Sequence, residues 1–158
     1  MKLVQIFFGL GFFIVAFTTC QTTRKQPATS NSKQDSLNAD RQKWLSQVQR
    51  SIKGKEQQSV DSVFSNLTVL SGFPAENLLF AMEAWSKGLG VSCGHCHNTG
   101  NFSSDINPKK KIAREMVLMG NQISSNLKKI EGLSTRPIVN CVTCHRGELK
   151  PAFRMNSK

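Results

Sequence analysis

Apolar residues recur at helical spacing in three stretches of the chain, residues 40–52, 74–90 and 107–130. Side chains three and four positions apart share one face of a helix, so each stretch predicts an amphipathic helix. Pro74 fits a first helical position, and the Asn107-Pro108 pair fits a helix start. Gly54 fits the end of the first helix, and Gly88 and Gly90 fit the end of the second. The apolar stripes are Trp44, Leu45, Val48 and Ile52; Leu78, Met82, Trp85 and Leu89; and Ile112, Met116, Met119, Ile123 and Leu127.

The segments between these helices predict little regular structure. Residues 67–70 are more extended than helical by composition, and residues 98–106 form a polar loop. Residues 20–39 are rich in Gln, Thr, Ser and Asn without apolar spacing, so we expect a disordered tether there. The predicted fold is therefore mainly α with little strand, in one domain over residues 40–158.

The amino terminus has the layout of a secretory signal. Lys2 precedes an apolar run that ends at Phe17, and that run is shorter than the roughly 20 residues of a membrane span. We expect residues 1–19 to be a signal peptide and Cys20 to be the residue that bacterial lipoproteins lipidate. Phe17 and Thr19 depart from the usual residues of that signal, which leaves an uncleaved anchor or ordinary cleavage as alternatives. The expected location is periplasmic, on a membrane through the lipid anchor.

One pattern, Cys-x-x-Cys-His, occurs twice, at residues 93–97 and 141–145, and the two copies contain every cysteine except Cys20 and all three histidines. Two thiols at this spacing can each add to a vinyl group on one porphyrin edge, and the adjacent histidine is then held under the iron. Zinc, disulfides or a dithiol redox centre would each use the cysteines, but none explains a histidine after each second cysteine. The pattern predicts two covalently bound haem c groups, attached through Cys93, Cys96, Cys141 and Cys144, with His97 and His145 as iron ligands.

The formal net charge of +11 changes the expected partners. The propionates of two haems would add roughly four negative charges and leave the exported domain basic. No aromatic residues interleave with the basic ones, so we expect no nucleic-acid binding. Redox proteins with acidic docking faces, or an anionic membrane surface, are the expected partners. Arg114, Arg146 and Lys109 to Lys111 could pair with propionates, although for the lysines a solvated basic face is the favoured interpretation.

The second axial position of each iron needs a further ligand. His95 lies inside the first motif and cannot easily turn onto that iron, which leaves methionine as the available side chain. Methionines on helical stripes are more commonly core residues, so spacing alone does not assign them. The candidates are Met82, Met116, Met119 and Met155.

Residues from about 52 to 151 resemble one half of the four-haem cytochrome subunit of photosynthetic reaction centres, and small exported two-haem relatives of it. The resemblance runs in order through Val69-Leu70, Pro74-Ala75, Met82, Leu89 to Cys93, Cys96-His97, Ala113-Arg114, Met116, Met119 and Cys141 to Gly147. It implies that each haem packs along the helix that precedes its motif, and that a methionine of that helix is the sixth ligand. The implied ligands are Met82 for the haem of His97 and Met116, or failing that Met119, for the haem of His145. Two motifs replace the four of the family, so a role in photosynthesis is not implied.

Two functions are compatible with such a haem protein. The first is an electron-transfer protein that passes single electrons between membrane-bound and soluble partners, and that is not an enzyme. The alternative is a haem enzyme or sensor, peroxidase-like or gas-binding, with one open iron site. That alternative needs a polar residue beside the open iron, and no histidine remains for it.

Overall fold

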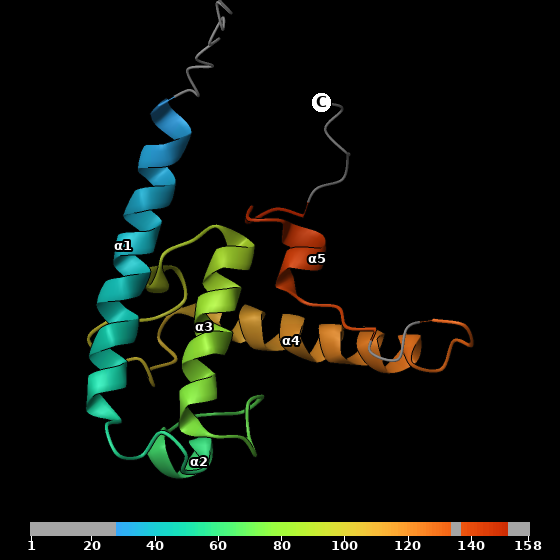
Figure 1. Cartoon of the computed structure of the whole chain (residues 1–158), viewed down its shortest axis with the longest axis horizontal. Coiled ribbons are helices and arrows are strands. Elements are labelled where there is room, and N and C mark those ends of the chain that lie inside the picture. The colour runs from blue at the N-terminus through green and yellow to red at the C-terminus, as the bar shows by residue number, and fades with distance from the viewer. Residues whose placement is uncertain (1–27, 134–136, 152–158) are drawn as a thin grey trace, which may run out of the picture.

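The computed structural model describes residues 28–133 and 137–151, and within them the chain is mainly α-helical, which confirms the predicted fold class (Figure 1). The elements are α1 (Ala28–Ser51), α2 (Val60–Val63), α3 (Ala75–Leu89), the 3-10 helix η1 (Cys93–His95), α4 (Pro108–Leu127) and α5 (Cys141–His145). Strand pairing in the described part is limited to two isolated bridges, Ser59 with Pro74 and Asn98 with Asn101. Residues 67–70, expected to be extended, belong to no strand.

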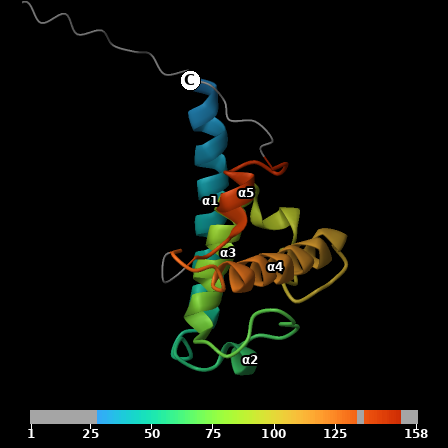
Figure 2. The same cartoon turned by 90° about the vertical axis from the view of Figure 1, so that its right-hand side faces the viewer.

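Helices α1 and α3 lie side by side, and α4 runs crosswise to both (Figures 1 and 2). Helix α1 begins at Ala28, twelve residues before the predicted start at Asp40. The expected disordered tether is therefore wrong over residues 28–39, and its remainder, residues 20–27, lies outside the described part. Residues 32–36 of this helix are all exposed, and an exposed stretch needs no apolar face, which is why the pattern there showed none. No helix in the described part of the chain combines the length and apolar composition needed to cross a membrane.

The predicted apolar stripe of helix α3, like that of α1, faces the interior. Pro74 is its N-cap residue rather than its first helical residue, and Gly90 ends it in the left-handed conformation at φ 63°. Gly90 is also a point of close contact, since a Cβ built there would meet the Gly147 carbonyl oxygen at 1.8 Å. The Gly147 N–H donates to the Gly88 carbonyl at 2.9 Å. The end of α3 and the residues after α5 are thus held backbone to backbone.

Helix α4 begins as predicted, with the Asn107 side chain accepting from the Lys109 N–H and Pro108 in the first turn. Its second half is joined to the segment before the second motif, because the Ser124 hydroxyl accepts from the Val139 N–H at 2.9 Å. The helix ends at Leu127, three residues before the predicted end at Ile130.

The protein core of the described part is small. Its buried hydrophobic side chains are Ile52, Val60, Ala75 and Leu78, whereas large apolar residues of α4, including Ile112, Met116 and Met119, are about half exposed. A chain of this size normally buries much more apolar surface on folding. The interior has room for a large apolar group in a mainly apolar cavity.

Candidate haem sites

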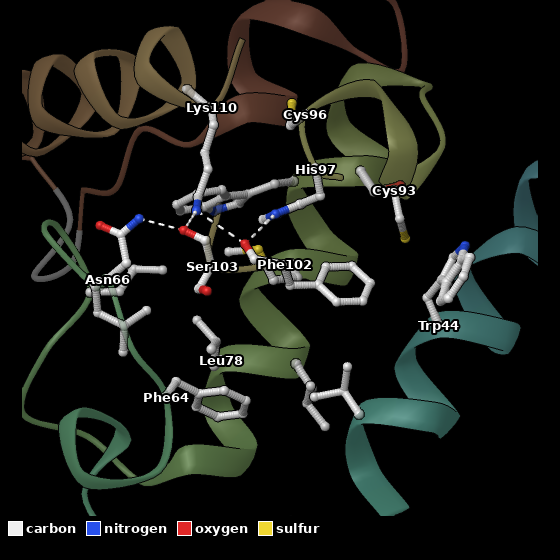
Figure 3. A pocket seen from close by; sticks show the side chains of 18 of the residues that line it. Trp44, Phe64, Asn66, Leu78, Cys93, Cys96, His97, Phe102, Ser103 and Lys110 are labelled. Atoms are coloured by element: carbon white, nitrogen blue, oxygen red, sulfur yellow. Dashed lines mark hydrogen bonds between the residues drawn. The ribbon is translucent and has the colours of Figure 1, made fainter. Parts of the chain in front are cut away.

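A cavity of about 390 Å³ lies between α1, α3, the first motif and the start of α4 (Figure 3). Its size falls in the range of roughly 300 to 1,000 Å³ that is usual for small-molecule and cofactor sites. Most of the lining is apolar, and all four residues of the predicted α3 stripe contribute to it. The cavity brings together Cys93, Cys96 and His97 of the first motif with Met82 of α3.

His97 is oriented for metal binding through its second nitrogen. Its Nδ1 lies 3.1 Å from the Phe102 carbonyl oxygen, and because a carbonyl can only accept, Nδ1 carries the proton. In a neutral ring Nε2 is then the free ligand nitrogen. The Phe102 ring lies 5.3 Å from the imidazole and 5.7 Å, edge-on, from Trp44 of α1. Burial lowers the pKa of His97, which favours the neutral ring that binds iron.

Helix α1 holds the start of the first motif in place. One carboxylate oxygen of Asp40 accepts from the Cys93 N–H at 2.8 Å, and the other accepts from the Trp44 indole N–H at 3.1 Å. Burial, and then the Asp40 carboxylate, raise the pKa of the Cys93 thiol to about 11. Burial also raises the pKa of Cys96. Both thiols are therefore protonated at neutral pH. When a thiol adds across a vinyl group, the sulfur bonds to one carbon and the proton goes to the other, so no leaving group is needed.

A buried arginine joins α1 to the end of α3. Arg41 is 1% exposed and donates to the Ser86 hydroxyl at 2.7 Å and to the Asn38 side-chain oxygen at 2.9 Å. It also reaches the carbonyls of Ser86 at 3.3 Å and Val91 at 3.4 Å. Because all of these oxygens are neutral, the charge of Arg41 is stabilised by hydrogen bonds to dipoles and not by a carboxylate. These bonds hold α1 against the residues that lead to the first motif.

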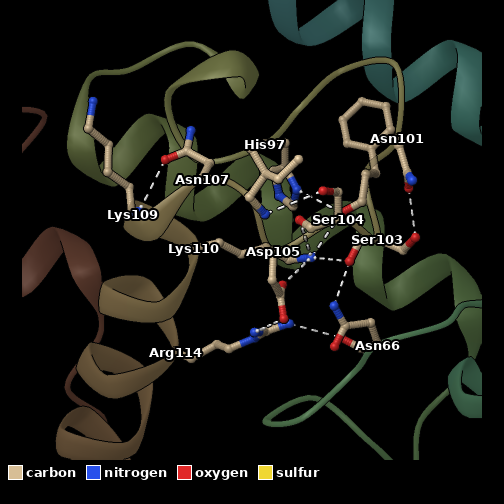
Figure 4. A network of polar contacts seen from close by, with 12 residues as sticks. Asn66, His97, Asn101, Ser103, Ser104, Asp105, Asn107, Lys109, Lys110 and Arg114 are labelled. Carbon is tan, nitrogen blue, oxygen red and sulfur yellow. Dashed lines mark hydrogen bonds and ion pairs between the residues drawn. The ribbon is translucent and has the colours of Figure 1, made fainter.

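A polar network around Lys110 borders the cavity at the start of α4 (Figure 4). The Lys110 ammonium donates to the carbonyls of Phe102 at 3.0 Å, Ser103 at 2.8 Å and Ser104 at 3.1 Å, and forms an ion pair with Asp105 at 3.0 Å. The favoured interpretation of a solvated lysine is wrong for Lys110, which is only 9% exposed. The sequence does not indicate which of three consecutive lysines is buried.

Arg114 completes this network from the next turn of α4. It donates to the second carboxylate oxygen of Asp105 at 3.0 Å and to the Asn66 carbonyl at 3.0 Å. Arg114, followed by Asn66 and Lys110, holds the pKa of Asp105 well below its usual range. Lys110 and Arg114 both line the cavity. They could also contact acidic groups of a molecule bound in it.

The second motif forms helix α5 and is stabilised at its start. The Asn140 side chain accepts from the Thr143 N–H, and the Thr143 hydroxyl accepts from the Asn140 N–H, which is a reciprocal capping box. His145 repeats the arrangement of His97, with Nδ1 3.1 Å from the Glu148 carbonyl oxygen. Its Nε2 is likewise the free nitrogen. Cys141 is half-buried, and burial raises its thiol pKa, whereas Cys144 is exposed.

The predicted methionines of α4 lie away from the first cavity. Successive residues of a helix are about 100° apart, so Met116 and Met119 are about 120° and 180° from Lys110 around the helix. They are 47% and 50% exposed, and neither lines the first cavity. One face of α4 thus borders the first site, and the methionine face is separate from it. Cys20 and Met155 lie outside the described residues.

The alternative interpretations of the cysteines find no support in the described part of the chain. All four motif thiols are free. In residues 28–133 and 137–151, no three His, Cys, Asp or Glu side chains gather as a metal site would need. The two motifs stand at separate places, one in the cavity and one on α5. Sequence reasoning missed Asp40, Arg41 and Phe102 as partners of the first motif, because each lies outside the motif and nothing in its spacing indicates the contact.

Known proteins have sequences similar to that of this chain. Residues 16–155 match the family of the photosynthetic reaction centre cytochrome C subunit. Cytochrome c-554 of Chloroflexus aurantiacus is 35% identical over 85 residues, which is 51% of this chain and 20% of that protein. The photosynthetic reaction center cytochrome c subunit of Rubrivivax gelatinosus is 34% identical over 93 residues, 50% of this chain and 25% of that protein. This chain therefore spans about a fifth to a quarter of the length of the curated relatives it matches.

Cytochrome subunits of reaction centres are electron carriers and not enzymes, which agrees with the prediction for this chain. Covalent haem c binding is a property of the same family. The match covers both motifs, α3 and α4. The chain belongs to the family of the photosynthetic reaction centre cytochrome C subunit.

Proposed function

We propose that the protein is an exported two-haem cytochrome c that passes single electrons between redox proteins. One electron is accepted from a reduced donor and given to an oxidised acceptor, so the protein returns to its starting state. The observation that carries this proposal is the cavity that gathers Cys93, Cys96, His97 and Met82. A c-type haem would supply the redox-active iron. Cys93 and Cys96 would form its two thioether bonds, and His97 and Met82 would be its two iron ligands.

Met82 is the proposed sixth ligand at the first site. It lies on the α3 stripe with Leu78, Trp85 and Leu89, and all four side chains line the cavity that also contains His97. A thioether ligand raises the reduction potential, and an apolar lining does so as well, because both disfavour the extra charge of ferric iron. The apolar stripe and the ligand are thus parts of one helix face.

Met116, rather than Met119, is the proposed sixth ligand at the second site. The segment before Cys141 approaches α4 at Gly120 and Ser124: Val139 donates to Ser124, and its carbonyl lies 3.6 Å from a Cβ built at Gly120. Met116 lies about 40° from Gly120 around the helix, whereas Met119 lies about 100° away. The row formed by Met116, Gly120 and Ser124 therefore faces the segment that carries the second motif.

The location and partners follow from the ends and charge of the chain. We propose that residues 1–19 are a signal peptide, that Cys20 is lipidated, and that the cytochrome domain, which starts with α1 rather than at residue 40, is held at a membrane on the periplasmic side. The formal charge of +11 supports redox partners with acidic docking faces. No nucleic-acid partner is proposed.

The test begins with the haem-loaded wild type. Two haems per chain, low-spin spectra with a methionine-to-iron absorption band, and no shift on adding carbon monoxide to the reduced protein are expected. A single haem, or a haem that binds carbon monoxide, would refute the proposal of a two-haem electron carrier.

Methionine variants test the ligand assignments. Met82→Ala and Met116→Ala should each remove the methionine band of one haem while covalent haem content stays at two. Met119→Ala is the matched control, because it removes the same side chain from the same helix and should leave both bands. Loss of a band in Met119→Ala with retention in Met116→Ala would reverse the second assignment.

A further inference from the structure

The two motif histidines have the same hydrogen bond but different surroundings. His97 donates from Nδ1 to the Phe102 carbonyl at 3.1 Å, and His145 donates from Nδ1 to the Glu148 carbonyl at the same distance. The Phe102 oxygen has a second donor, the Lys110 ammonium at 3.0 Å. Among the described residues, no lysine or arginine side chain donates to the Glu148 oxygen. The first site therefore has a buried cation beside the acceptor of its histidine (Figure 4), and the described part of the second site has none on the Glu148 oxygen.

A cation that donates to the same carbonyl as the histidine changes the strength of the hydrogen bond that the histidine makes. The Nδ1 hydrogen bond of a ligating histidine raises the basicity of the ring and so stabilises the more highly charged iron. An ammonium that donates to the same carbonyl withdraws electron density from it, which weakens the bond to Nδ1. The positive charge acts in the same direction, because it disfavours ferric iron directly. Both effects raise the reduction potential of the iron that His97 holds.

We propose that Lys110 is a positioning residue that acts through the Phe102 carbonyl on His97, and that it makes the haem of the first motif the higher-potential centre. This inference rests on the proposed function, since it needs two haems with the assigned histidines. It gives the two redox centres an order: at equilibrium the first haem is reduced before the second.

The surroundings hold Lys110 in this role. It is 9% exposed, donates to three successive carbonyls and pairs with Asp105. Asp105 offsets part of its charge, but the same carboxylate also pairs with Arg114, so these three side chains keep one net positive charge. Burial adds to the difference, because the hydrogen bond made by His97 is partly buried whereas the one made by His145 is exposed.

The main experiment is a spectroelectrochemical titration of the haem-loaded Lys110→Met variant beside wild type. At a fixed applied potential, the ratio of reduced to oxidised first haem should fall roughly three- to tenfold, and tenfold corresponds to 59 mV for one electron. The second haem should keep its potential. Lys110→Arg, which keeps the charge and can still donate, should restore most of the shift.

Lys111→Met is the matched control. It removes the same charge from the next residue of α4, but the Lys111 side chain is 80% exposed and its partner is Glu115 at 3.8 Å. A solvated charge is screened, so this variant should leave both potentials nearly unchanged. Equal shifts in the two variants, or equal shifts of both haems in Lys110→Met, would overturn the proposed role of Lys110.

The wild type gives a second test that does not depend on how well a variant folds. In a stepwise reduction followed by nuclear magnetic resonance, the first haem is identified by its contacts to Trp44, which lines the first cavity. That haem should be reduced first, and the Nδ1 proton of His97 in the reduced protein should resonate upfield of that of His145. The reverse order of reduction would overturn the inference while two low-spin haems per chain would still support the proposed function.

Discussion

Gly90 offers a sharp test of how the two motifs are held together. Its φ of 63° is in the left-handed region, and a Cβ there would lie 1.8 Å from the Gly147 carbonyl oxygen and 2.8 Å from the Gly147 carbonyl carbon. Alanine at Gly90 therefore has two costs. The left-handed conformation costs about 1–2 kcal/mol in an L-residue. The backbone clash cannot be relieved by turning a side chain, and overpacking of this kind costs about 1–3 kcal/mol.

Gly72 separates these two costs. It has a φ of 74°, but a Cβ built there would meet nothing within 4 Å. Gly72→Ala should lower the free energy of unfolding by about 1–2 kcal/mol, through the conformation alone. Gly90→Ala should lower it by about 2–5 kcal/mol, the sum of both costs. It should also loosen the contact between Gly147 and Gly88 that joins α5 to α3.

The assay is guanidinium unfolding of the haem-loaded proteins, followed by circular dichroism, with the slopes compared before the midpoints are interpreted. The spectrum of each haem is recorded as well, and Gly90→Ala should perturb the second haem more than Gly72→Ala does. If the two variants were equally stable, the close approach of Gly90 to Gly147 would not exist in the folded protein.

Two further predictions concern the ends of the two sites. Arg114 and its neighbours depress the pKa of Asp105, so the ionised carboxylate stabilises the fold at pH values above the pKa of an unfolded aspartate, about 3.9. This stabilisation is lost as the pH falls through the lower pKa of the folded state. The stability of wild type should therefore approach that of Asp105→Asn in acid, and a constant difference in stability between pH 7 and pH 2 would contradict this. Asn140→Ala removes the capping box of α5 and should cost about 1 kcal/mol in urea unfolding, whereas Thr143→Ser, which keeps the capping oxygen, should change stability by less than about 0.5 kcal/mol.

The sequence predicted the structural elements that depend on residues close together in the chain. The two Cys-x-x-Cys-His motifs, the stripe of α3 and the start of α4 at Asn107 all appear in the structure where the pattern placed them. Helical spacing and caps depend on residues within a few positions of each other, so they can be read along the chain. The resemblance to the reaction centre cytochromes, now confirmed as family membership, pointed to Met82 among the candidate methionines, and Met82 lines the first cavity.

The boundaries of α1 show where local reading fails. Its first half has Leu37 as its one large apolar residue, and a pattern without an apolar face is as typical of a disordered segment as of an exposed helix. Whether such a segment is helical depends on the helix that it extends. The half of α1 from Asp40 to Ser51, which bonds to Ser86 and lines the first cavity, supplies that helix, and the more exposed residues before it continue the same hydrogen-bond ladder.

Only the tertiary structure decided which charged groups support the first site. Arg41 bonds to Ser86, 45 positions away, and Asp40 bonds to Cys93, 53 positions away. Lys110 is one of three consecutive lysines, yet it is buried while Lys111 is exposed. The sequence determined which chemistry the chain carries, because thiols, imidazoles and their spacing are local. The structure determined how that chemistry is tuned, because burial and hydrogen bonding depend on which distant segments the fold brings together.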